Sequence, residues 1–300
     1  MSCHIHYRER QRSRLAVTTG IAAATLLLLA LDLATGSSGI PLRELLASLL
    51  AGPSADNPQA LILWELRLPM SVTALFVGAS LSLAGLSIQT ITANALASPS
   101  TLGITSGASF GAALAITAGF TIAGELWTGT IAAAFISALL ICGLILALGR
   151  MRGMTPSTLI LAGIIMNFFF IALEQLLIYL ASPETAQLIN GWTFGNLERA
   201  GWLSAAAAGG ALLLGLLMLA PAAWQLTTLS VGEERAKSLG VPVARLRILV
   251  FAVSSLRHDR LRGARSAPLR EAAPRRRSAL AHPGKHSLGR LHHAPLLPHR

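Results

Sequence analysis

The sequence has little charge for its size. Only 12% of its 300 residues are charged, whereas soluble domains carry about 25%. Hydrophobic residues make up 53% of the chain, and the mean hydropathy is +0.61. This balance excludes an ordinary soluble domain and indicates an integral membrane protein.

Cysteine and known site motifs are also scarce. The two cysteines, Cys3 and Cys142, lie in a basic N-terminal segment and in an apolar run, so they cannot form a disulfide framework. No Cys/His spacing is typical of a zinc site, and no GxxxxGK[ST] phosphate-binding loop occurs. The sequence therefore predicts no catalytic residues, no metal site and no cofactor. We expect a protein that is not an enzyme.

Most of the net charge of +11 lies at one end of the chain. Residues 257–300 hold 11 Lys+Arg against 2 Asp+Glu, and 41 of these 44 residues are Arg, Pro, Ala, His, Leu, Ser or Gly. Such a segment cannot build a hydrophobic core, so we expect a disordered tail rather than a nucleic-acid site. There are two alternatives. One is a polybasic tail that binds anionic lipid, and the other is a metal-binding tract at His282, His286, His292 and His293.

Apolar runs predict an all-α polytopic membrane protein with six complete transmembrane helices. Two of them are the halves of 66–114, which a polar break at 94–99 separates. The others lie at 15–35, 126–148, 158–180 and 203–224. A seventh run begins at Ile248 but ends at Leu256, although about 20 residues are needed to cross a bilayer. We therefore expect a basic N-terminus at 1–14, an incomplete transmembrane domain at 15–256 and the tail at 257–300. The composition of the tail is typical of a GC-rich gene read in the wrong frame, which suggests a frameshift.

Arginine and lysine indicate the orientation. They collect before the first run, after the fourth and around the segment after the sixth, and alternation places all three on the cytoplasmic side. The N-terminus is therefore predicted to be cytoplasmic, with an anchored signal sequence as the alternative for the first run. The connection at 36–66 is expected to lie outside, with a short surface helix at 42–50.

Small residues recur every four positions in both halves of 66–114. Ala74, Gly78 and Ser82 do so in the first half, which also contains Gly85, and Gly103, Gly107 and Gly111 do so in the second. Because small residues let membrane helices approach closely, both faces are expected to pack inside the bundle. The alternative is that these faces line a translocation pathway.

Two charged residues of the apolar region are unusual. Glu174 is the one acid well inside an apolar run, so it is a candidate polar site within the membrane, with an interfacial position as the alternative. Arg67 lies on the predicted outer side, against the positive-inside trend. An acidic partner outside the membrane would explain it.

Residues 229–241 predict a short charged helix on the cytoplasmic side. Ser230 and Glu233 have the spacing of a capping box, and Glu233 and Lys237 are spaced for an ion pair on one helix face. Gly240 and Pro242 end the helix. Because a helix of about two turns is marginal alone, we expect it to dock, either on a soluble partner or at the lipid interface.

Four motifs then resemble the FecCD family. They are ELRLP at 65–69, NALASPSTLGITSGASFGA at 94–112, GWTFGNL at 191–197 and LSVGEERAKSLGV at 229–241. The family comprises permease subunits of ABC importers for ferric siderophores, haem and vitamin B12. The resemblance implies a ten-helix subunit of the bacterial cytoplasmic membrane that pairs with a second, identical or different, permease subunit. It also implies two ATP-binding subunits and a periplasmic or lipoprotein binding protein as partners.

The resemblance also implies roles for individual residues. Arg67 matches a contact for the binding protein, although Met70 stands where many members have a second arginine. The ATPase-coupling helix is matched by Ser230, Gly232, Glu233, Glu234, Ala236, Leu239 and Gly240. Two alternatives remain for the chain as a whole: a non-functional product of a frameshifted permease gene, and an ion-coupled secondary transporter that uses Glu174.

Overall fold

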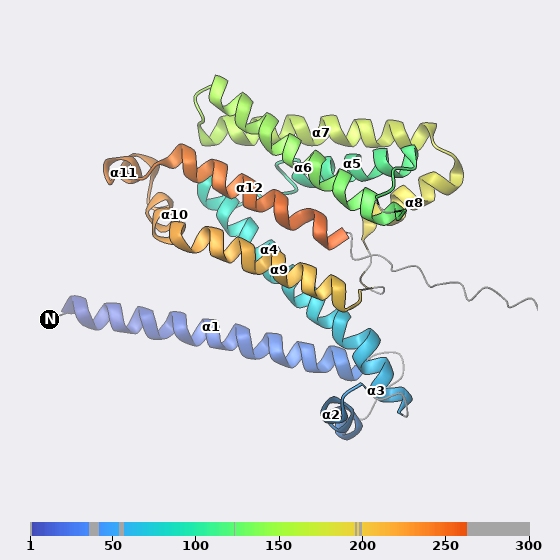
Figure 1. Cartoon of the computed structure of the whole chain (residues 1–300). Helices are drawn as coiled ribbons and strands as arrows, with labels where there is room; N and C mark the ends of the chain where they lie inside the picture. Colours follow the sequence, from blue (N-terminus) through green and yellow to red (C-terminus); the bar gives the residue numbers. More distant parts are fainter. Residues whose placement is uncertain are drawn as a thin grey trace, which may run out of the picture. The chain divides into compact units, whose positions relative to one another are not determined.

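The computed structural model describes residues 2–35, 42–53, 57–122, 124–195, 197 and 200–262 (Figure 1). Within these ranges the regular structure is helical, apart from one isolated bridge between Ile122 and Glu125. The helices, in chain order, are α1 (Ser2–Thr35), α2 (Leu42–Ala51), α3 (Pro58–Ile62), the π-helix η1 (Leu63–Arg67), α4 (Leu68–Thr92), α5 (Ile104–Ala118), α6 (Leu126–Met151), α7 (Pro156–Leu180), α8 (Pro183–Phe194), α9 (Trp202–Leu219), the 3₁₀ helix η2 (Ala220–Ala222), α10 (Ala223–Ser230), α11 (Glu233–Ser238) and α12 (Val243–Arg262).

Five helical stretches in the described ranges are long and apolar enough to cross a membrane, so the chain is a multi-pass membrane protein. They are Gln11–Thr35, Pro58–Thr92, Leu126–Met151, Pro156–Leu180 and Trp202–Ser230. The prediction of six complete spans needs correction, because the third one is the 15-residue helix α5. At 1.5 Å per residue α5 reaches about 22 Å, less than the roughly 30 Å of a hydrocarbon core. The turn at 93–103 includes the predicted polar break and the first four residues of this span, and α5 extends to Ala118 instead.

The core is built around α5. Ten of its 15 residues are buried, and it packs against α6, α7 and α8. The helix α12 completes the bundle by packing against α4, α6 and α9 (Figure 1). Between residues 11 and 35 of α1, by contrast, the apolar side chains are largely exposed, and Leu33 near the C-terminal end is the buried one. A surface of this kind is typical of a helix that faces lipid.

The entry into α4 is distorted by Pro69. Proline has no backbone N–H, so one carbonyl in the preceding turn loses its helical donor. The chain forms the π-helix η1 at this point, and the indole Nε1 of Trp202 donates to the carbonyl of Trp64 at 3.0 Å. The ring of Trp64 packs near that of Trp202, with centroids 6.2 Å apart, and its own Nε1 donates to the carbonyl of Ser48. This exchange joins α2, η1 and α9.

The remaining expectations for the fold had mixed outcomes. The short helix predicted at 42–50 is confirmed as α2, whereas α8 was not predicted, since 183–194 was assigned to an outer loop. The run that starts at Ile248 belongs to α12, which continues to Arg262, six residues past the boundary at Leu256. The rest of the basic tail, which includes His282, His286, His292 and His293, lies outside the described residues.

Candidate functional site

The predicted charged helix is α11, which follows α10 after a two-residue turn. The capping box is wrong: Ser230 is the last residue of α10, and its hydroxyl donates to the carbonyl of Thr227 at 2.7 Å. Gly232 occupies the N-cap position instead, with φ of +140° and no side-chain hydrogen bond. Because Gly232 accepts this left-handed backbone without steric cost, it turns the chain sharply between the two helices.

The end of α11 is as expected. Gly240 has φ of +79°, and the amide of Val241 donates to the carbonyl of Ala236 at 3.0 Å. This is the geometry of a left-handed C-terminal cap. Ala236 is fully buried and holds one face of α11 against the bundle.

Glu233 carries two ion pairs. Lys237 lies 2.9 Å from its Oε1, which confirms the predicted pair within α11, and Nη2 of Arg247 in α12 lies 2.8 Å from its Oε2. Partial burial raises the pKa of Glu233, but the hydrogen bonds from Arg247 and Lys237 outweigh this effect. The pKa therefore lies below its ordinary value, and the carboxylate is ionised at neutral pH.

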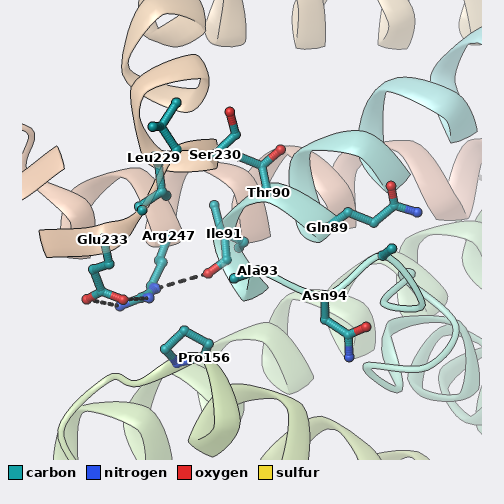
Figure 2. A pocket seen from close by; sticks show the side chains of 13 residues that line it. Gln89, Thr90, Ile91, Ala93, Asn94, Pro156, Leu229, Ser230, Glu233 and Arg247 are labelled. Carbon is teal, nitrogen blue, oxygen red and sulfur yellow. Dashed lines mark hydrogen bonds and ion pairs between the residues drawn. The ribbon is translucent and has the colours of Figure 1, made fainter. Parts of the chain in front are cut away.

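Arg247 is the buried cation of this site, with 2% of its surface exposed. Its guanidinium donates to Glu233 and to the carbonyl of Ile91 at the end of α4 (Figure 2). It also donates to the carbonyl of Met154 in the turn between α6 and α7. A buried charge of this kind is tolerated only when it is paired and hydrogen-bonded. Arg247 thus joins α12 to three other parts of this end of the bundle.

A cleft of about 390 Å³ opens beside this ion pair. Figure 2 shows its walls, which come from the end of α4, the start of α7 and the α10–α11 turn. The polar side chains that line it are Gln89, Thr90, Asn94, Ser230, Glu233 and Arg247. The cleft separates α11 from the end of α4 on one side, so the contact through Arg247 bridges the two.

The outward face of α11 combines charge and apolar surface. Glu234, Arg235 and Lys237 are exposed, and Val231 and Leu239 on either side are 61% and 65% exposed. Charged residues between two exposed aliphatic side chains form a surface suited to contact with another protein or with the lipid interface. Of the predicted coupling residues, Glu234, Leu239 and Gly240 are exposed here, whereas Ala236 points into the bundle.

Arg67 lies at the other end of the bundle, in η1. Its side chain is half-buried, and Nη1 donates to the carbonyl of Leu33 at 2.6 Å. Beside it the hydroxyl of Ser71 donates to Asp32 at 2.5 Å. These bonds hold the end of α1 against the start of α4, so Arg67 has a structural contact that the sequence did not reveal.

The two small-residue faces have different surroundings. A Cβ added at Gly107 would lie 1.9 Å from Cδ1 of Ile141, and one at Gly111 would lie 2.5 Å from the carbonyl oxygen of Ala133. A Cβ at Gly103, where φ is +74°, would lie 2.7 Å from the amide nitrogen of Asn167. Close packing is therefore confirmed for α5.

The expectation for α4 is wrong within this chain. A Cβ at Gly78 or Gly85 would meet nothing within 4 Å, and the face formed by Ala74, Gly78 and Ser82 is exposed. The reason is that α5 supplies the tight contacts with α6 and α7, while α4 meets α9 and α12 through its other faces.

Glu174 is buried within the bundle. It is 5% exposed, and Oε1 accepts a hydrogen bond of 2.8 Å from the hydroxyl of Thr193 in α8. The short helix α8 therefore covers this acid. Among the residues that the structure describes, no group of three or more His, Cys, Asp or Glu side chains has the arrangement of a metal site.

Comparison with known proteins identifies the family. The sequence profile of the FecCD transport family matches residues 24–257. The chain belongs to the FecCD transport family.

Individual relatives agree with this assignment. The molybdate import system permease protein MolB of Haemophilus influenzae is 36% identical over 200 residues, which are 66% of this chain and 58% of that protein. The cobalamin import system permease protein BtuC of Halobacterium salinarum is 32% identical over 223 residues, 73% of this chain and 59% of that one. The chain thus spans less than two thirds of the length of these relatives.

A solved structure shares the fold. It is described as an inward-facing conformation of a metal-chelate type ABC transporter. The match has a TM-score of 0.70 and 28% sequence identity, and it covers 83% of this chain and 75% of the other. The similarity therefore extends over most of the helical bundle of this FecCD family member.

The residue that sequence reasoning missed in this FecCD chain is Arg247. It was assigned no role from the sequence, although an arginine directly before an apolar run is a candidate for pairing with a nearby acid. The backbone carbonyls of Ile91 and Met154 cannot be recognised as acceptors from the sequence, because every residue type has a backbone carbonyl. They could not have been found without the fold.

Proposed function

We propose that this chain is a transmembrane permease subunit of an ABC importer for metal chelates. It would move a ligand delivered by a binding protein, and a separate ATP-binding subunit would supply the hydrolysis, because the chain has no phosphate-binding loop. The proposed location is the cytoplasmic membrane, with the N-terminus and α11 on the cytoplasmic side. A second permease subunit would complete the pathway.

The observation that carries the proposal is the presentation of α11. Its charged outer face and the exposed side chains of Val231 and Leu239 project from the bundle, while Ala236 and Glu233 hold the inner face. A six-residue helix has little stability of its own, so its position on the bundle is set by these contacts. An ATP-binding subunit that binds this face would shift the helices to which α11 is bonded.

The relatives and the matched motifs support the proposed ligand class. Cobalamin and molybdate appear in the names of two relatives, and the matched structure is described as metal-chelate type. We propose a chelate such as an iron-siderophore complex, with haem and cobalamin as the other members of the class. Arg67 remains our proposed contact for the binding protein.

The first experiment tests the ATPase contact. The charge reversal Glu234→Lys changes an exposed carboxylate on α11, whereas Glu44→Lys makes the same change on the exposed surface of α2. The chain is co-expressed with its ATP-binding partner, and the amount of partner that co-purifies in detergent is measured. We expect Glu234→Lys to reduce co-purification and Glu44→Lys to leave it unchanged; equal retention by both variants would contradict the assignment of α11.

The second experiment tests transport. Proteoliposomes that contain the chain, its ATP-binding partner and the binding protein are supplied with a radiolabelled ferric hydroxamate siderophore, ferric citrate, haem or cyanocobalamin. We expect ATP-dependent uptake of one of these ligands. Absence of ATP-dependent uptake of all four would refute the metal-chelate class.

A further inference from the structure

The hydrogen bonds of Arg247 connect four elements that are distant in the sequence. Its Nη2 lies 2.8 Å from Oε2 of Glu233 and its Nη1 lies 3.4 Å from Oε1, so the carboxylate of α11 is held by two nitrogens. The Nε donates to Ile91 at the end of α4, and Nη1 also donates to Met154 after α6. A planar guanidinium can satisfy this set, because its five donors point in fixed directions.

The backbone is unusual at or near the two carbonyls that accept hydrogen bonds from Arg247. Among the described residues, the two that are not glycine and have a positive φ are Ala93 at +47° and Met154 at +52°. One follows Ile91 by two residues, and the other is itself an acceptor of Arg247. Residues other than glycine rarely adopt this conformation, and they keep it where the surrounding structure holds them there. The first turn ends α4 just after Ile91, whose carbonyl lies in the last turn of the helix, and the second contains Met154, whose own carbonyl accepts from Arg247.

The contacts of α11 with the bundle are otherwise few. Ala236 is the buried residue of the helix, and the cleft of about 390 Å³ separates α11 from the end of α4 (Figure 2). The pair between Glu233 and Lys237 lies within α11 and fixes nothing outside it. Glu233 and Arg247 therefore form the polar link between α11 and the helices that cross the membrane.

We infer that Arg247 is a positioning residue that makes α11 follow the cytoplasmic ends of α4, α6 and α12 as one body. The inference rests on the proposed function, in which α11 receives the movement of the ATP-binding subunit. With the link intact, a displacement of α11 is transmitted to these helices. Without the link between Glu233 and Arg247, α11 tilts about Ala236 across the cleft, and its displacement is not transmitted to these helices.

The test is a distance measurement that needs no transport. Spin labels are attached at Ser238→Cys on α11 and Met151→Cys at the end of α6, both exposed positions, in a chain whose two native cysteines are replaced. The distance distribution between the labels is measured by pulsed electron paramagnetic resonance. We expect a narrow distribution with Arg247 and a broad one with Arg247→Gln or Arg247→Lys, because a lysine ammonium lacks the planar fork. Arg245→Gln, an exposed arginine two residues away, is the matched control and should leave the width unchanged.

The same measurement separates positioning from a merely structural role. If Arg247→Gln fails to give a monodisperse protein, Arg247→Lys and Glu233→Gln, which keep a hydrogen-bonding group, decide the question. A lower unfolding temperature with an unchanged distance distribution would overturn the inference.

Transport measurements then distinguish this inference from the proposed function. In proteoliposomes with the ATP-binding partner and the binding protein, we expect Arg247→Lys to keep ATP hydrolysis while the ligand moved per ATP falls by about tenfold. A broadened distribution together with no uptake by the unaltered chain would refute the permease proposal and leave the role of Arg247 intact. Normal uptake per ATP with Arg247→Lys would overturn the inference and leave the permease proposal intact.

Discussion

Gly78 and Gly111 offer a direct test of the packing described above, because the same substitution meets open space at one position and a neighbouring helix at the other. A Cβ at Gly111 would lie 2.5 Å from the carbonyl oxygen of Ala133 and 2.5 Å from Cβ of Ser137. Ordinary contacts lie at 3.4–4 Å, so α5 and α6 would have to separate by about 1 Å. At Gly78 an added Cβ meets nothing within 4 Å.

The expected magnitude follows from the difference between the two variants. Replacing a helical glycine by alanine gains about 1 kcal/mol of helix propensity at either position, so this contribution cancels in the comparison. What remains is the overpacking at Gly111, which costs about 1–3 kcal/mol in a close-packed core. We therefore expect Gly111→Ala to be less stable than Gly78→Ala by about 1–3 kcal/mol.

The assay is unfolding in mixed detergent micelles with increasing SDS, followed by tryptophan fluorescence. The free energy of unfolding of each variant is compared with that of the unaltered chain under the same conditions. Equal stability of Gly111→Ala and Gly78→Ala would refute the close approach of α5 and α6. It would also remove the evidence that the two small-residue faces differ.

Three further predictions concern the charged residues. The pKa of Glu233 is lowered in the folded protein, so its ion pair stabilises the fold at pH values above the ordinary pKa of 4.5. This stabilisation is lost as the pH falls through the lower, folded pKa. Acid unfolding of Glu233→Gln should therefore depend less on pH below 4.5 than that of the unaltered chain. Glu174→Gln keeps an acceptor for Thr193, so ATP-dependent uptake should persist, whereas its loss with an active ATP-binding partner would favour ion coupling. Arg67→Gln should accelerate amide hydrogen exchange in the last turn of α1, and an unchanged rate would contradict the bond to Leu33. Arg43→Gln on the exposed face of α2 is the control for this last measurement.

The sequence determined the features that depend on a residue's own chemistry and on its near neighbours. Apolar runs of about 20 residues indicate membrane spans, because every backbone polar group in the hydrocarbon core must be satisfied within the segment. The end of α11 at Gly240 and the pair between Glu233 and Lys237 were predicted for the same reason, since both arise within one turn of helix. The four motifs that indicated the FecCD family are likewise read along the chain.

The capping box failed although it is local, because a competing local structure formed. Ser230 remained in α10 and bonded to Thr227, and Gly232 made the turn. The start of α5 was predicted four residues too early for a related reason. Composition distinguishes an apolar turn poorly from an apolar helix, and the left-handed residue that ends α4 is Ala93 rather than a glycine.

The tertiary structure alone decided which residues meet. Gly78 and Gly111 lie in two series of small residues with the same four-residue spacing, yet Gly78 faces open space and Gly111 faces α6. Contact depends on how helices far apart in the chain are arranged. Glu174 is covered by a short helix that was not expected, and Arg247 reaches two carbonyl oxygens that any residue type would offer. Spacing along the chain specifies the faces of a helix, whereas the partner of each face is specified only when the whole bundle has packed.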